Sequence, residues 1–157
     1  MSIIRAGVLS DSHTTASDPL FPKLAARAFA DCGIIIHAGD LTDPGILAAF
    51  SGKTVYAVHG NTCNAAARIR LPRRLAFQLG RFTIALAHGD GRMSIEDSLW
   101  AEFPEADCII YGHTHRAVCH KEGGEAGVLF LNPGAFKNGS YAILEAGDEL
   151  RAELRHL

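Results

Sequence analysis

The stretch "CGIIIHAGD", residues 32–40, joins three consecutive isoleucines to a terminal aspartate. Similar apolar runs that end in polar residues recur at residues 3–11, 54–61, 82–90 and 107–115. They are rich in Ile and Val and are bounded by Gly, Asp or Asn, which is typical of β-strands. Their nearly continuous hydrophobicity, in place of strict alternation, indicates strands that are covered on both faces. We therefore expect a framework of buried strands.

Two helix-like segments lie between the first of these strands. Residues 18–29 begin with Asp18 and Pro19, and residues 42–50 repeat this start at Asp43 and Pro44. Aspartate as the N-cap followed by proline at the first helical position is a common way to begin a helix. The first part of the chain is therefore predicted to alternate strands and helices.

The pattern changes after residue 74. Residues 74–89 predict two strands joined by a hairpin turn, and residues 94–103 predict a helix with Ser94 as its N-cap. Residues 117–134 and 140–157 alternate further strands with Gly-rich turns, so we expect this half to be mostly antiparallel. Two sheets packed face to face, with helices outside, would accommodate both halves.

Length and composition favour one domain over residues 1–157, because the chain has 48% hydrophobic residues and no linker or repeat. The net charge of -2 excludes the strongly basic footprint of a dedicated nucleic-acid binder. We expect a soluble, cytoplasmic protein with no membrane partner, since the sequence shows neither a leader-like N-terminus nor a long apolar run. The four cysteines form no C-x-x-C pair and are interpreted as reduced core thiols.

Polar side chains collect where the predicted strands end. They are Asp11, His13, Asp40, Asn61, His88, His113 and His115. In β/α sheets the loops beyond the carboxyl ends of strands converge, so these side chains are expected to meet. Oxygen and imidazole donors together suit Mn, Fe, Zn, Co or Ni. Seven ligands are more than one tetrahedral ion can use, whereas two ions that share a carboxylate fit the number.

Each of these residues taken alone has a simpler interpretation. Asp11 and His13 are typical of a turn or a helix cap, and Asn61 after glycine is typical of a turn. His88 could equally be a hydrogen-bonded, partly buried imidazole. Their joint occurrence at strand ends, with glycines beside four of them where backbones must approach closely, favours a metal site.

The polar motifs as a set resemble those of a known family. They are "SDSH" (10–13), "GDLTD" (39–43), "GN" (60–61), "HG" (88–89), "GHTH" (112–115) and "NPG" (132–134). In order and approximate spacing they are similar to those of the calcineurin-like metallophosphoesterases, especially the small single-domain members. The resemblance runs from residue 3 to about residue 145. It implies an α/β fold, a four-layer α/β/β/α sandwich of two mixed sheets.

The resemblance also implies a site that holds two divalent transition-metal ions. Asp11, His13, Asp40 and His115 would hold the first ion, and Asp40, Asn61, His88 and His113 the second, with Asp40 bridging. His113 and His115 are expected to point the same way, as i and i+2 residues of an extended turn do, and by their motif positions each would serve a different ion of the pair. A metal-bound hydroxide would attack the phosphate, with Asn61 and His88 as catalytic residues that orient or stabilise the phosphoryl oxygens. Manganese is the expected metal, with Fe, Zn, Ni or Co as alternatives.

The expected function is a phosphodiesterase that hydrolyses small phosphate esters. A protein-interaction scaffold, as found among some small relatives, is the main alternative, and the presence of all seven metal residues argues against it. A metal-dependent nuclease is a further alternative, although a chain of net charge -2 offers little to hold a long nucleic acid. A homo-oligomer is left open.

The sequence departs from the family pattern at two loops. "GNTCN" places Thr62 where many larger relatives have a histidine thought to protonate the leaving group, so we expect faster hydrolysis of esters with good leaving groups. Cys63 and Asn64 are a further divergence. "HGD" places Asp90 where small relatives commonly have histidine; we interpret Asp90 as a cap of the next turn, with substrate repulsion or ligand orientation as alternatives.

The remaining histidines and the arginine cluster have no metal role in this interpretation. His37 and His59 are expected to be hydrogen-bond partners of metal ligands or packing residues. His120 and His156 are expected to be exposed. The basic cluster of Arg68, Arg70, Arg73 and Arg74 is interpreted as a solvated face, with contact to the distal part of a phosphorylated substrate as the alternative.

Overall fold

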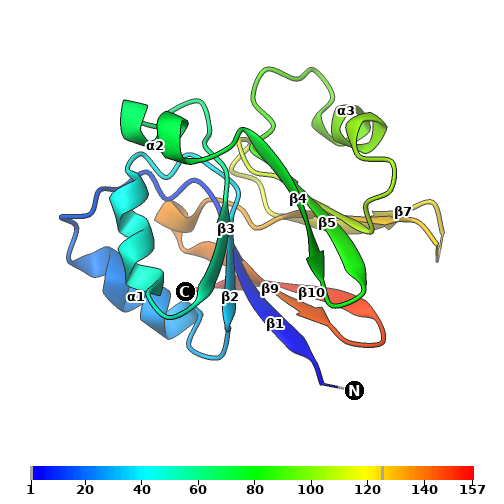
Figure 1. Cartoon of the computed structure of the whole chain (residues 1–157), viewed down its shortest axis with the longest axis horizontal. Coiled ribbons are helices and arrows are strands. Elements are labelled where there is room, and N and C mark those ends of the chain that lie inside the picture. The colour runs from blue at the N-terminus through cyan, green and yellow to red at the C-terminus, as the bar shows by residue number, and fades with distance from the viewer. Residues whose placement is uncertain (1, 125) are drawn as a thin grey trace.

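The computed structural model describes residues 2–124 and 126–157 and contains two five-stranded sheets (Figure 1). The first sheet has the order β10-β9-β1-β2-β3. Its strands are β1 (Ile4–Leu9), β2 (Ile34–His37), β3 (Thr54–Ala57), β9 (Ser140–Ala146) and β10 (Leu150–His156). The second sheet has the order β4-β5-β6-β8-β7. Its strands are β4 (Arg74–Leu79), β5 (Phe82–Ala87), β6 (Cys108–Ile110), β7 (Val118–Glu122) and β8 (Val128–Asn132).

Both sheets are mixed, as predicted. In the first sheet β1, β2 and β3 are parallel, and β9 is antiparallel to both β1 and β10. In the second sheet the predicted β4–β5 hairpin is present, but β5, β6 and β8 are parallel. The prediction of a mostly antiparallel second half was therefore wrong for these strands. A helix between β5 and β6 returns the chain across the sheet, and such a crossover produces parallel pairing.

The helices are α1 (Leu20–Ala28), α2 (Ala65–Arg70) and α3 (Ile95–Glu102), with two 3₁₀ turns, η1 (Pro44–Phe50) and η2 (Phe136–Asn138). Asp43 caps η1 as predicted, because its carboxylate accepts the N–H of Gly45 at 2.9 Å. The prediction for α1 was wrong by one residue: Pro19 is its N-cap, and Asp18, one residue before the cap, accepts the N–H of Leu20 at 2.9 Å. The second segment is a 3₁₀ helix and not an α-helix. No helix in the described part of the chain is long and apolar enough to cross a lipid bilayer.

One helix was not predicted. α2 is only six residues long, and Asn64 caps it by accepting the N–H of Ala67 at 2.9 Å. Ser94 does precede α3, but its hydroxyl donates to Asp97 at 3.0 Å and makes no cap hydrogen bond to the helix backbone. The four cysteines are all unpaired, as expected; Cys119 is exposed and so lies outside the core.

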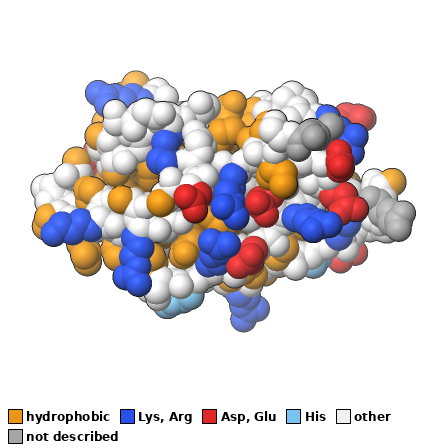
Figure 2. All heavy atoms as spheres, turned by 90° about the horizontal axis from the view of Figure 1, so that it is seen from below, with side chains coloured by type: hydrophobic (Ala, Val, Ile, Leu, Met, Phe, Trp, Pro, Cys, Tyr) orange, Lys and Arg blue, Asp and Glu red, His pale blue; other side chains and the backbone are white. Residues whose placement is uncertain are grey.

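The end of the molecule from which β1 starts carries basic and acidic side chains interspersed with apolar ones. Figure 2 shows this face, on which Lys and Arg alternate with Asp and Glu. Opposite charges distributed in this way cancel over short distances in salt solution. The loops that follow β1, β2 and β3 lie at the other end of the sandwich, near α2 and α3 in Figure 1.

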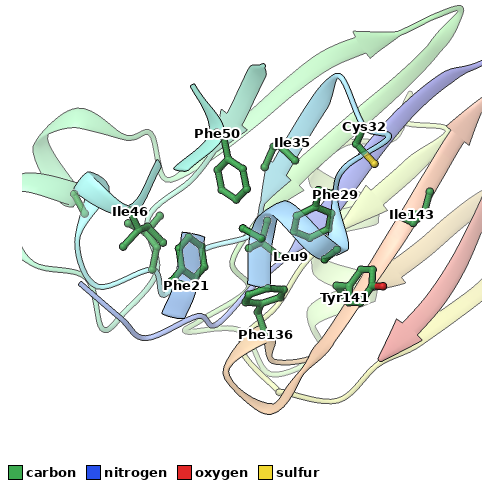
Figure 3. Close-up of a cluster of buried hydrophobic side chains, with 14 of the residues drawn as sticks. Leu9, Phe21, Phe29, Cys32, Ile35, Ile46, Phe50, Phe136, Tyr141 and Ile143 are labelled. Atoms are coloured by element: carbon green, nitrogen blue, oxygen red, sulfur yellow. The ribbon is translucent and has the colours of Figure 1, made fainter. Parts of the chain in front are cut away.

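Three apolar layers hold four layers of structure together. Neighbouring residues of a strand point into different layers: Leu9 packs with α1 and η1, whereas Val8 packs between the two sheets. Figure 3 shows the first layer, where Phe21 of α1 and Phe29, the residue that follows α1, lie among side chains from η1 and the first sheet. The third layer joins the second sheet to α3 around Leu99. The order helix, sheet, sheet, helix confirms the predicted four-layer sandwich.

Candidate metal centre

The seven predicted site residues follow the ends of five parallel strands. Asp11 and His13 follow β1, and Asp40 follows β2. Asn61 follows β3, His88 follows β5, and both His113 and His115 follow β6. Because parallel strands end at the same edge of a sheet, and the two sheets pack face to face, all five loops lie at one end of the sandwich.

Six of these residues form two groups of potential ligand atoms. Asp11, His13 and His115 form one group, called here the first cluster, and Asp40, His88 and His113 form the second cluster. Within each cluster the ligand atoms lie within 4.8 Å of one another.

Two contacts extend and connect the clusters. Asn61 adjoins the second cluster, with the end of its amide 3.1 Å from Nε2 of His88. Oδ2 of Asp40 lies 3.1 Å from Nε2 of His88 and 3.8 Å from Nε2 of His13, so this carboxylate stands between the clusters.

Two polar atoms at the centre have no hydrogen-bond partner among the described residues. They are Oδ1 of Asp11 and Nε2 of His13, which are buried and 3.7 Å apart. Nε2 of His115 lies 3.3 Å from the same carboxylate oxygen. Buried polar atoms without a partner are costly, and a carboxylate oxygen beside an imidazole nitrogen is an arrangement that a bound cation would stabilise. Carboxylate and imidazole donors therefore fit divalent transition metals here.

The backbone is strained at the candidate ligands. Asp11, His13, Asp40, His113 and His115 all have positive φ, between 47° and 69°. Residues other than glycine adopt this region rarely, and it is maintained where the surrounding structure imposes it, frequently at functional sites. The expectation of an extended turn at His113 and His115 was wrong, because both are left-handed. Their imidazoles nevertheless reach different clusters.

Two glycines let the site loops approach one another. A Cβ atom on Gly60 would lie 2.7 Å from the backbone nitrogen of Asp40 and would overlap its carboxylate. A Cβ atom on Gly112 would overlap the hydroxyl of Ser10 and lie 2.9 Å from Oδ2 of Asp11. The absence of a side chain at both positions is therefore required by the packing around the two aspartates.

Asp40 and His88 form a buried acid–base pair. Burial favours the neutral carboxyl, but hydrogen bonds from His88 and from the Thr62 amide outweigh it and lower the pKa of Asp40 well below its usual range. Burial also favours the neutral imidazole, but the adjacent Asp40 carboxylate outweighs it and raises the pKa of His88. Nδ1 of His88 is 2.8 Å from the carbonyl of Ala38, to which it donates, so Nε2 faces the cluster.

His37 connects the loops of the two clusters through buried hydrogen bonds to Ser12 and Gly39. It is fully buried, its Nδ1 accepts the N–H of Gly39 at 3.1 Å, and its Nε2 lies 3.0 Å from the hydroxyl of Ser12. Burial, and then the nearby His88, lower its pKa to about 3, so the ring is neutral. The structure thus places His37 as a partner of the ligand loops, as predicted.

Other supporting contacts were not identified from the sequence. The amide N–H of Thr62 donates to Oδ1 of Asp40 at 2.8 Å. The Asn132 side chain, which is fully buried, donates to the carbonyl of Gly112 and to the hydroxyl of Thr114, each at 3.1 Å, and so holds the loop of His113 and His115. The Asn-Pro-Gly triplet after a strand was the available signal for Asn132, whereas nothing local indicated the amide of Thr62.

Cys63 and Asp90, which depart from the family pattern, both make contacts within the protein. Sγ of Cys63 accepts the N–H of Gly60 at 3.1 Å. The carboxylate of Asp90 lies 3.8 Å from a guanidinium nitrogen of Arg73, a pairing that was not among the interpretations weighed.

The expectation that His120 is exposed was wrong. The side chain is half-buried, because it stacks on Phe130 beside α3, and its Nε2 lies 2.9 Å from Oε1 of Glu96.

Comparison with curated proteins gives a consistent result. A probable metallophosphoesterase of Methanothermobacter thermautotrophicus is 34% identical over 134 residues, which cover 82% of this chain and 75% of the relative. A probable metallophosphoesterase of Methanocaldococcus jannaschii is 31% identical over 139 residues, which cover 82% of this chain and 66% of the relative. The chain thus spans two thirds to three quarters of the length of these relatives.

Solved structures share the fold. A predicted phosphoesterase of Streptococcus pneumoniae is 26% identical, with a TM-score of 0.73 over 99% of this chain and 91% of that one. An archaeal phosphodiesterase has a TM-score of 0.72 at 20% identity over 97% and 100% of the two chains. Vacuolar protein sorting 29 of Cryptosporidium parvum has a TM-score of 0.75 at 16% identity over 99% and 98%. At these last two identities the likeness concerns the fold alone.

The model of one family also matches nearly the whole chain. The calcineurin-like phosphoesterase superfamily domain matches residues 4–149, which include all the strand-end residues described above. Together with the two curated relatives, this match and the mixed two-sheet fold show that the chain belongs to the calcineurin-like phosphoesterase superfamily.

Proposed function

We propose that the protein is a dinuclear-metal-dependent phosphodiesterase that hydrolyses small phosphodiesters. The observation that carries this proposal is the pair of clusters with Asp40 between them, together with the unpartnered atoms of Asp11 and His13. A protein that uses this fold only as a scaffold has no need of strained, desolvated acceptors at one centre. The archaeal phosphodiesterase of the same fold is in keeping with this activity.

The residues that would hold the cations follow from the clusters. Asp11, His13 and His115 would hold one cation and His88, His113 and Asn61 the other, with Asp40 shared. Manganese is the expected ion, with iron, zinc, nickel or cobalt as alternatives. When bound, two divalent cations would supply Lewis acidity to the phosphoryl group and would lower the pKa of a bound water.

The residues of the chain itself would position the substrate. His88 is held by the Ala38 carbonyl and Asn61 lies against it, so both side chains have fixed directions at the edge of the second cluster. We assign to them the orientation of the phosphoryl oxygens. Thr62 provides no imidazole that could protonate a leaving group, so esters with acidic leaving groups should react faster.

Metal-dependent hydrolysis tests the proposal directly. The protein would be stripped with a chelator, reloaded with Mn, Ni, Zn or Mg, analysed for metal, and assayed with bis(4-nitrophenyl) phosphate and 4-nitrophenyl phosphate. We expect hydrolysis of the diester that depends on a transition metal and exceeds hydrolysis of the monoester. Asp40→Asn should lower the rate by about 100-fold or more, the usual cost of losing one group that stabilises transition-state charge.

A matched control is Asp31→Asn. Asp31 is a largely exposed carboxylate whose neighbour is Arg5, in the strand β1 that leads to the site, and its replacement should leave the rate unchanged. Equal activity of the metal-free protein, or full activity of Asp40→Asn, would overturn the proposed function.

A further inference from the structure

A surface cleft of about 700 Å³ lies between the start of β4, the loop of residues 90–94 and the start of α3. Three arginines, Arg73, Arg74 and Arg92, line it together with Asp90 and Asp97, and we refer to it as the arginine cleft. It is shallow and open to solvent, so that a charged group of a ligand could reach its arginines. None of the seven candidate metal ligands lines it.

Both walls of the arginine cleft are connected to loops of the candidate metal centre, one along the chain and the other by a backbone hydrogen bond. Asp90 is two residues from His88, which belongs to the second cluster. On the other wall, the carbonyl of Pro72 accepts the N–H of His59 at 3.0 Å, which joins the residue before Arg73 to the loop of Asn61. A substrate whose phosphodiester lies at the second cluster could therefore extend into this cleft.

The three arginines differ in how strongly their charge is compensated. Arg92 donates to the Ser98 hydroxyl at 2.5 Å and to both carboxylate oxygens of Glu102, at 3.2 and 3.3 Å, and only 18% of its side chain is exposed. Arg74 lies 3.6 Å from the same Glu102 carboxylate. These contacts occupy the N–H donors of Arg92 within the protein. They also place the Glu102 carboxylate close to the charge of Arg74.

Arg73 is the least compensated of the three. Within the described part of the chain its only ion-pair contact is Asp90 at 3.8 Å, and 58% of its side chain is exposed. The distance exceeds that of a charge-assisted hydrogen bond, so the guanidinium keeps its N–H donors for a ligand. Guanidinium is the side-chain group that best matches the planar, bidentate recognition of phosphate.

The geometry points to Arg73 as a residue that binds a second phosphate group of the substrate. This inference rests on the proposed function and makes it more specific: the preferred substrates are small phosphodiesters that carry a further phosphate. Asp90 would weaken this binding by competing for the same guanidinium. The arginine cluster, interpreted from the sequence as a solvated face, then contains a residue that binds substrate phosphate, Arg73.

Two chromogenic esters that differ only in the second phosphate test the inference. They are the 4-nitrophenyl ester of thymidine 5′-phosphate and the same ester with an added 3′-phosphate. Both release 4-nitrophenolate, so their chemical step is matched. For the metal-loaded protein we expect a KM about 10-fold lower with the 3′-phosphate, the size of effect that one partly exposed charge-assisted hydrogen bond provides.

Variants on either side of the contact sharpen the test. Arg73→Ala should raise KM for the ester with the 3′-phosphate by about 10-fold and leave kcat and the other ester unchanged. Asp90→Asn should lower KM for the 3′-phosphate ester only. The matched control is Arg70→Ala, which removes the same charge from exposed α2 outside the cleft and should leave the preference intact.

A binding measurement separates this inference from the proposed function. In ¹⁵N-labelled, metal-free protein, inorganic pyrophosphate should shift the Nε–Hε signal of Arg73 and not that of Arg70. If the metal-loaded protein hydrolyses neither ester, the proposed function fails, and the shift alone decides whether Arg73 binds phosphate. Equal KM for both esters, an equal effect of Arg70→Ala, or no shift at Arg73 would overturn the inference and leave the proposed function standing.

Discussion

The first and second clusters differ in how far the protein itself satisfies their polar atoms. In the second cluster His88 is 1% exposed and contacts Asp40, Asn61 and the Ala38 carbonyl. In the first cluster His13 and His115 are 23% and 34% exposed, and buried atoms of Asp11 and His13 lack partners. Protein contacts thus hold the Asp40–His88 pair of the second cluster, although His113 is partly exposed, whereas the first cluster has two buried polar atoms without a partner among the described residues.

This difference matters for the order in which the centre forms. A cluster whose residues already hydrogen-bond to one another is preorganised, but a cation must displace a proton shared between Asp40 and His88. In the first cluster no hydrogen bond joins the ligand side chains to one another among the described residues, and its imidazoles are more exposed than that of His88. We therefore expect substitutions in the two clusters to separate into effects on folding and effects on metal binding.

The largest expected effect comes from removing one imidazole from each cluster in metal-free protein. His88→Ala leaves the buried Asp40 carboxylate without its partner and should lower the free energy of unfolding by about 3 kcal/mol. His115→Ala, at a partly exposed position, should lower it by less than about 1 kcal/mol. Urea unfolding in the presence of a chelator measures both, and equal losses would show that the clusters are equally dependent on metal.

An intermediate effect should come from His37, which joins the two loops. Its pKa in the folded state is about 3 and the ordinary value is 6.5, so the folded protein disfavours the charged ring. Well above pH 6.5 the ring is neutral in both states and the stability is unaffected, whereas between pH 6.5 and pH 3 the unfolded chain binds a proton that the folded chain does not, so stability is lost as the pH falls. The loss should approach about 1.4 kcal/mol per pH unit below pH 6.

The variant His37→Gln separates this contribution from other acid effects. Glutamine has a donor and an acceptor but does not titrate, so the unfolding free energy of the variant should fall less steeply between pH 6.5 and pH 4.5 than that of the unmodified protein. Thermal or urea unfolding at a series of pH values measures the slopes. Parallel slopes would mean that His37 is not held neutral by the fold.

The smallest expected effect concerns Thr62, which contacts both clusters. Its backbone N–H binds Asp40, whereas its hydroxyl lies 3.3 Å from Nδ1 of His13. Thr62→Val keeps the first contact and removes the second, so manganese affinity should fall by about fivefold, the net worth of one hydrogen bond. Thr62→Ser should behave as the unmodified protein does in calorimetric titration. A hundredfold loss with valine would instead indicate that the hydroxyl itself is a ligand.

Much of the fold could be predicted because its signals are local. The isoleucine run before Asp40 forms β2 with the expected bounds to within a few residues, and Asp43 caps the segment that it precedes. α2 was missed because its six residues contain only one that is buried, Ala67, so there was no apolar periodicity to detect. The parallel pairing of β5, β6 and β8 was missed because strand order depends on contacts between segments that are distant in sequence.

The sequence by itself determined which residues stand at the strand ends, because a buried apolar run followed by a turn is recognisable from neighbouring residues alone. Asp40 between the clusters and the separation of His113 and His115 were expected from the family resemblance. Only the tertiary structure decided the distances between these side chains and that Arg73 faces Asp90 while Arg74 shares Glu102. Those outcomes depend on how five loops from two sheets pack against one another. The positive φ angles of the candidate ligands, which local preferences oppose, are imposed by that same packing.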